Sequence, residues 1–295
     1  MERKIISLAK STNVITLPSR WCEENSLGKG DSVSVSENGD SVVISPVAME
    51  KTIVLDISGA EPMIRRILGA AYKSGYDLME ITYSSEHELE TAEEVIEQEF
   101  VGFEIVSVNK EKTFLKAKSI SEPSPEDFER MLRRMMRLIS DMADDILKHL
   151  SEKEHLKKIS EKDKEVNKIA DYCRRIINRN SLLRLSERYV RNPPLYFIVE
   201  QLEKVSDGFR DLALCQDVID EKMFSDVKDY FDDFYTLFYN FNFTALAGFG
   251  KRRYEMKEQF EKKRIDQYHY ESISILRDIL EKTFDMNGAL IAINL

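Results

Sequence analysis

Two short elements of the sequence carry acidic residues at a spacing that suits cation binding. Leu202-Glu-Lys-Val-Ser-Asp207 recurs later in the chain as Leu280-Glu-Lys-Thr-Phe-Asp285. The repeated acid pairs are Glu203 with Asp207, and Glu281 with Asp285. Residues four apart share one face of a helix, and like charges at this spacing disfavour the helix unless a positive group lies nearby. A hard cation would supply that positive charge.

A third polar stretch, on the preceding helical segment, carries Asp163 and Asn167 at the same spacing. Carboxylate and amide oxygen atoms are ligands that Mg²⁺, Mn²⁺, Ca²⁺ or iron accepts. We therefore predict a metal site from Asp163, Asn167, Glu203 and Asp207, with Glu281 and Asp285 as the corresponding acids of the second copy. The alternative is a solvated helix face that nearby lysines and arginines neutralise.

The segments that would position these acids are helical. Residues 124–295 have an apolar period of 3.6, which predicts an amphipathic helix of about seven turns from residue 126. Further helices are expected near 152–180, 195–217, 221–239, 250–268 and 271–292. Gly248 and Gly250 are expected to separate the fourth and fifth helices. The repeat predicts a six-helix bundle of two three-helix units, about 124–217 and 220–295.

The first 46 residues have a different pattern, with strands of period two expected at 4–8, 14–17, 32–36 and 42–44, a short helix at 19–25, and a hairpin turn at Asn38-Gly39. A domain this small buries too little apolar surface to fold alone, so a partner chain is expected. Near its start, basic residues outnumber the acidic Glu2, and they are candidate phosphate contacts of a DNA-binding surface. These residues are Arg3, Lys4, Lys10 and Arg20.

Residues 50–120 combine stretches with the apolar period of a strand and stretches with the apolar period of a helix. Strands are expected at 52–57, 78–83, 103–108 and 113–118, with helices at 62–73 and 90–99. This order predicts a small α+β domain with an open sheet that links the other two domains.

The composition limits the function classes. The 295 residues carry 43 Lys+Arg against 53 Asp+Glu, a net charge of −10, so any DNA contact has to be local. Three cysteines form no disulfide framework, and the chain shows no signal peptide or membrane-spanning stretch, so a cytoplasmic protein without membrane insertion is expected. Nucleotide-binding and nucleophile motifs are missing, which disfavours an enzyme.

The L-E-x-x-x-D element of each unit resembles the repeated L-E-R-I-G-D element of PhoU proteins, which regulate phosphate uptake. Asp163-Lys-Glu-Val-Asn-Lys168 is similar to that family's D-x-E-V-D-R element, with Asn167 in place of an aspartate. Lysines 204 and 282 replace an arginine, and Ser206 or Phe284 replaces a glycine. The resemblance implies a metal ion or multinuclear cluster on the bundle, of iron, zinc, manganese or magnesium.

The N-terminal segment resembles the AbrB/SpoVT swapped-hairpin domain, whose T-I-P and G-D-x-V-x-V signatures match Thr16-Leu-Pro18 and Gly30-Asp-Ser-Val-Ser-Val35. This resemblance implies two chains interlocked in one β-barrel that often binds DNA. The stretches Ala70–Tyr76 and Val101–Val106 resemble the part that joins these two domains in archaeal PhoU-related proteins.

Together these features predict a multidomain α+β protein that acts as a dimeric, negative regulator of phosphate uptake. The implied partner is the phosphate-transport ATPase or a signalling protein. The alternative is an AbrB-type transcription factor or an antitoxin-like dimer, in which the bundle is only a protein-interaction module. A metal-dependent phosphatase or esterase that uses the same carboxylates is a third possibility.

Overall fold

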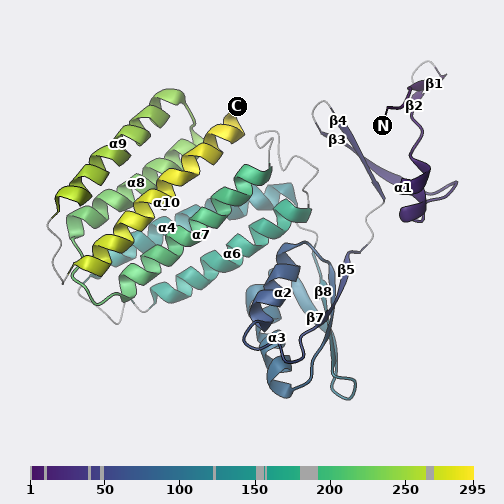
Figure 1. The fold of residues 1–295 in the computed structure, drawn as a ribbon, viewed down its shortest axis with the longest axis horizontal. Helices are drawn as coiled ribbons and strands as arrows, with labels where there is room; N and C mark the ends of the chain where they lie inside the picture. Colours follow the sequence, from purple (N-terminus) through teal and green to yellow (C-terminus); the bar gives the residue numbers. More distant parts are fainter. Residues whose placement is uncertain are drawn as a thin grey trace. The chain divides into compact units, whose positions relative to one another are not determined.

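A computed structural model of the chain describes residues 2–9, 12–38, 41–46, 50–121, 124–150, 156, 158–179, 192–263 and 269–295. The chain divides into two units, Met1–Glu50 and Lys51–Leu295. Figure 1 shows the elements of each unit. Lys10 and Gly39, which we singled out in the sequence, lie outside the described residues.

The N-terminal unit consists of two antiparallel hairpins and a short helix. β1 (Ile6–Ala9) pairs with β2 (Thr12–Val14), and β3 (Val33–Asn38) pairs with β4 (Ser41–Pro46). Between them in the sequence lies α1 (Ser19–Glu24). The helix and three of the predicted strands are therefore confirmed. The strand expected at 14–17 is wrong in its position, because β2 ends at Val14 and residues 15–17 form no strand.

The described residues of this unit form no buried core. No residue up to Glu50 whose side chain the structure describes is buried. Val35 pairs with Ile44 across the β3–β4 ladder, so the face that also carries Glu37 is mainly apolar, whereas Ser34 and Ser45 lie on the other face. Val35 is 61% exposed and Leu8 is 70% exposed.

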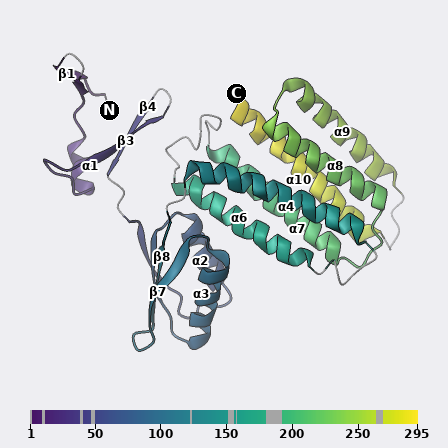
Figure 2. The same cartoon turned by 180° about the vertical axis from the view of Figure 1, so that it is seen from behind.

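The second unit begins with a four-stranded sheet and two helices. The strand order is β5-β6-β8-β7, with β5 (Thr52–Asp56) parallel to β6 (Leu78–Thr82). β8 (Phe114–Ser119) runs antiparallel to both β6 and β7 (Phe103–Asn109). Helices α2 (Ile64–Lys73) and α3 (Glu86–Glu99) cover one face of this sheet in both views (Figures 1 and 2). The predicted α+β class is confirmed.

Helix α3 begins four residues earlier than predicted because two side chains cap it. Ser85 Oγ accepts a hydrogen bond from the Glu88 backbone N–H at 3.2 Å. The Glu88 carboxylate in turn accepts from the backbone N–H groups of Ser84 at 2.6 Å, Ser85 at 3.0 Å and Gly59 at 2.6 Å. These reciprocal bonds form a capping box and also fix the Gly59 loop.

Glu88 should make the stability of this unit sensitive to acid. The hydrogen bonds from Ser84 and Gly59 lower the pKa of Glu88 from 4.5 to about 2. A carboxyl group with a lowered folded-state pKa stabilises the fold above its unfolded pKa, and this contribution is lost as the pH falls from 4.5 towards 2. We expect Glu88→Gln to flatten the dependence of the urea unfolding midpoint on pH across this range. Glu90→Gln, on the exposed face of the same helix, should leave the pH dependence of the unfolding midpoint as it is in the wild type.

The described residues from Pro125 onward form six long helices in two groups of three (Figures 1 and 2). The first group is α4 (Pro125–Lys148), α6 (Ile159–Arg179) and α7 (Asn192–Leu214), and the second is α8 (Glu221–Tyr239), α9 (Phe243–Lys262) and α10 (Tyr270–Asn294). α7 packs against α10. A Cβ atom at Gly208 would lie 2.6 Å from Ile279 Cγ1, so this close approach requires glycine.

The predicted start of α9 at residue 250 is wrong. The helix begins at Phe243, because Asn242 Oδ1 accepts from the Ala245 backbone N–H at 2.8 Å and caps it. Gly248 and Gly250 therefore lie inside the helix. Phe249 between them is buried and stacks on the Tyr230 ring, with 4.2 Å between the centroids, so tertiary packing outweighs the low helix propensity of the glycines.

Arg175 of α6 holds the α+β part against the helical bundle. Its side chain is only 1% exposed. Its Nη1 donates to the backbone carbonyls of Tyr72 at 3.0 Å and Tyr76 at 2.7 Å, and its Nη2 lies 3.3 Å from Asp77 Oδ1. The guanidinium carbon also lies 4.9 Å from the centroid of the Phe103 ring. One buried cation thus links the end of α2, the sheet and α6.

Candidate functional site: the acidic repeats of the helical unit

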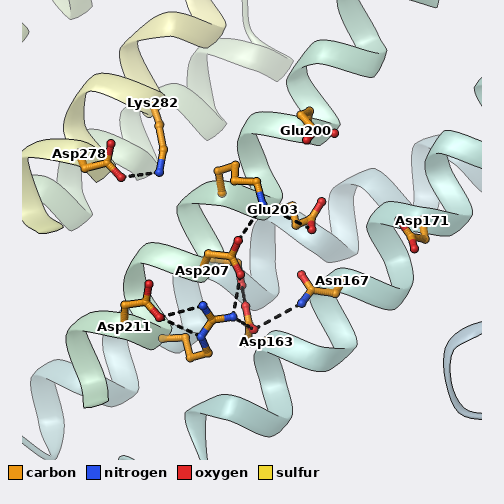
Figure 3. A network of polar contacts seen from close by, with 12 residues as sticks. Asp163, Asn167, Asp171, Glu200, Glu203, Asp207, Asp211, Asp278 and Lys282 are labelled. Atoms are coloured by element: carbon orange, nitrogen blue, oxygen red, sulfur yellow. Dashed lines mark hydrogen bonds and ion pairs between the residues drawn. The ribbon is translucent and has the colours of Figure 1, made fainter. Parts of the chain in front are cut away.

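The structure brings three of the predicted ligands together between α6 and α7 (Figure 3). Asp163 is 2% exposed and accepts hydrogen bonds from Ser206 Oγ at 2.7 Å and from Arg210 Nη1 at 2.7 Å. The same Arg210 nitrogen lies 2.7 Å from Asp207 Oδ1. Asn167 Nδ2 is 3.4 Å from Asp163 Oδ2. A guanidinium group therefore lies between the two carboxylates where we had expected a metal ion.

Glu203 takes part in a second cluster, one turn before Asp207 on α7. Its partner is Arg174 of α6, whose side chain is 4% exposed. Arg174 also lies 2.8 Å from Asp171 Oδ1 and 2.7 Å from Glu200 Oε2. Burial alone would lower the pKa of Arg174, but Glu203, Glu200 and Asp171 together raise it. Arg174 is therefore firmly charged and fixes α6 against α7.

The second repeat has the same arrangement at its first acid. Arg253 of α9 donates to Glu281 of α10 through Nη2 at 2.6 Å and Nε at 3.1 Å. Arg174 and Arg253 thus have equivalent roles, because each joins the middle helix of its unit to the glutamate of the L-E-x-x-x-D element. Charge-assisted hydrogen bonds of this kind are stronger than neutral ones. The repeat in the sequence corresponds to a repeated Arg–Glu contact.

The second acids of the two repeats differ in their surroundings. Asp207 has Lys204 Nζ at 2.9 Å in addition to Arg210. In the second repeat the corresponding Lys282 pairs with Asp278 instead (Figure 3). Asp285 forms no ion pair with a described residue. Partial desolvation and the negative charge of Glu281 raise its pKa. The repeats are therefore equivalent at the glutamate and not at the aspartate.

The prediction of a metal site remains a prediction. Among the described residues, no three or more aspartates, glutamates, histidines or cysteines converge in a way that could hold a metal ion. The oxygen donors fit a hard cation in type, but an ion bound by Asp163 and Asp207 would have to displace Arg210. The sequence already placed Arg210 one turn from Asp207, so this partner could have been found by its spacing. Arg174 and Arg253 lie on other helices and could not.

The predicted DNA contacts lie in the N-terminal unit. Arg3, Lys4 and Arg20 are exposed, and Arg20 Nε lies 2.7 Å from Glu24 Oε1 within α1. An exposed pair at this spacing contributes little to stability, so Arg20 is available to a phosphate group.

Comparison with known families identifies only this N-terminal part. Residues 7–52 match the family described as antidote-toxin recognition MazE, bacterial antitoxin. The match supports the swapped-hairpin type of domain inferred from the sequence. No curated protein and no solved structure matched the chain. No helix among the described residues is long and apolar enough to cross a membrane.

Proposed function

We propose that this protein is a homodimeric DNA-binding regulator in which the N-terminal unit dimerises and contacts DNA. The observation that carries the proposal is the match of residues 7–52 to an antitoxin domain whose described side chains include none that is buried. Such domains commonly dimerise and bind DNA or toxins. A second copy of the chain would cover the apolar face of each hairpin. The helical unit then acts as the module that receives the regulatory signal.

The charge distribution supports a local DNA contact. The chain as a whole repels nucleic acid with its net charge of −10. Arg3, Lys4 and Arg20 lie within twenty residues of the N-terminus and are exposed, and a dimer doubles their number. Such side chains release counterions when they contact phosphates, which makes the affinity depend on salt.

A salt titration tests this proposal. The chelator-treated protein should bind a duplex selected from a random pool tightly. For the triple variant Arg3→Gln, Lys4→Gln, Arg20→Gln, the slope of log K against log salt should shrink by about 5, because about 0.9 is lost for each of the dimer's six contacts. Lys251→Gln, an exposed lysine of α9, serves as the control. No sequence-selective binding, or an unchanged slope in the triple variant, would contradict the proposal.

A second candidate function is regulation of phosphate uptake through the helical unit. It is supported by the L-E-x-x-x-D elements, which occupy equivalent positions on α7 and α10 of two three-helix groups. In this case the acids bind a metal ion after Arg210 moves away, and the partner is the phosphate-transport ATPase or a signalling protein. The two candidates are compatible, since they use different units of the chain.

Metal analysis tests the second candidate. Protein purified without chelator should contain iron, zinc, manganese or magnesium. Glu203→Gln with Asp207→Asn should lower the affinity for the metal at least about tenfold, because the loss of an outer-shell partner alone has an effect of this size, and the metal content should fall with it. Glu93→Gln with Glu97→Gln on α3 has the same spacing and should retain the metal. Equal metal content in the two double variants would contradict a metal site at Glu203 and Asp207.

A further inference from the structure

The first half of α4 carries four arginines on one face. Arg130, Arg133, Arg134 and Arg137 follow the spacing i, i+3, i+4, i+7, so they share a stripe about 10 Å long. Together with Glu126 and Glu129 they line an open groove of about 700 Å³. The stripe thus gathers four guanidinium groups on one face of an acidic chain, with Asp127 and Glu165 beside them in addition to the two glutamates of the groove. Neither the acidic repeats nor the N-terminal unit accounts for it.

Two tyrosines of α8 orient the arginines at one end of this stripe. The Arg133 guanidinium carbon lies 4.1 Å from the centroid of the Tyr239 ring, and Arg137 Nε donates to the Tyr235 hydroxyl at 3.2 Å. No carboxylate of a described residue forms an ion pair with Arg137. Its terminal nitrogen atoms therefore have donor capacity for a ligand.

The other three arginines have acidic partners, and in each pair the arginine side chain is more exposed than the carboxylate. Arg130 contacts Asp127, Arg133 lies 3.5 Å from Glu129, and Arg134 contacts Glu165. The side chains of Arg130, Arg133 and Arg134 are 73%, 43% and 55% exposed. Ion pairs in high dielectric contribute little, so a ligand of higher charge can compete with these single carboxylates.

We propose that the arginine face of α4 binds a small anion with several phosphoryl groups, for which inorganic triphosphate is the probe. Guanidinium groups engage phosphoryl oxygens through two parallel hydrogen bonds, which lysine cannot do. Side chains one turn apart are about 5–6 Å apart at Cβ, so successive arginines meet successive phosphoryl groups of one ligand. A single phosphate or sulfate ion engages only part of the stripe. This site does not depend on the proposed DNA binding.

Calorimetric titration of the full chain with sodium triphosphate tests the site. We expect Arg134→Gln with Arg137→Gln to weaken binding at least about a hundredfold, since each charge-assisted hydrogen bond lost costs about tenfold or more. Arg134→Lys with Arg137→Lys keeps the charge and should give an intermediate loss. Arg277→Gln, an exposed arginine of α10, and the triple variant of Arg3, Lys4 and Arg20 should bind as the wild type does.

Several results would overturn the site. One is the absence of triphosphate binding, and another is sulfate binding with the same affinity at equal ionic strength. A loss in Arg277→Gln as large as that in the double glutamine variant would show an attraction by overall charge. If the glutamine variant bound duplex DNA more weakly while triphosphate did not bind the wild type, the face would be a nucleic-acid surface instead. Because the N-terminal variants serve as controls, the proposal can fail while the DNA-binding function holds.

Discussion

Val35→Asp should convert the proposed dimer to a monomer and abolish the tight DNA binding proposed for it. Val35 lies on the apolar face of the β3–β4 hairpin and is 61% exposed in the single chain. In a symmetric dimer the substitution occurs twice. Each copy removes about 1.5–3 kcal/mol of favourable apolar burial and places a carboxylate in an interface that excludes water. We expect the dissociation constant of the dimer to rise at least about a thousandfold, which corresponds to about 4 kcal/mol.

Light scattering measures the mass of this variant, and the salt titration described above measures its DNA affinity. Ser34→Asp is the matched control, because Ser34 neighbours Val35 on the same strand and lies on the opposite, polar face. It should remain a dimer. A dimeric Val35→Asp protein with unchanged DNA affinity would show that a surface other than this hairpin face joins the chains.

Arg175→Met should cause the largest loss of stability in the second unit. The change removes the Arg175 donor from the Tyr76 carbonyl and from the Tyr72 carbonyl, which keeps the Gly75 backbone N–H at 3.1 Å, and it weakens the pairing of Asp77. Removing one partner of a buried pair costs about 3–5 kcal/mol, because the remaining polar groups stay buried and unsatisfied. The free energy of unfolding from urea denaturation measures this loss.

Arg179→Met serves as its control one turn further along α6. Arg179 also contacts Asp77, but its side chain is 17% exposed and Arg175 still neutralises the aspartate when Arg179 is absent. We expect a loss of about 1 kcal/mol, as for a typical hydrogen bond. Equal losses in both variants would mean that the two arginines share the contact evenly and that the carbonyl bonds of Arg175 add little.

Much of the fold could be predicted because the pattern of apolar residues is local. The helix–strand order from Thr52 to Ser119 and the six helices of the bundle follow from periodicity alone. Errors fell at element boundaries. The capping box of Ser85 and Glu88 is readable from the spacing of these two residues, whereas the helical state of Gly248 and Gly250 depends on how Phe249 packs.

The sequence alone determined where the acidic pairs recur, which residues share a helical face, and that the N-terminal segment is too small to bury a core. These properties depend on residue spacing and composition, which follow directly from the amino-acid sequence. Only the tertiary structure decided which charges meet. Arg174, Arg210 and Arg253 reach the repeated acids, and two of these contacts cross from one helix to another, so no spacing along a single helix could specify them.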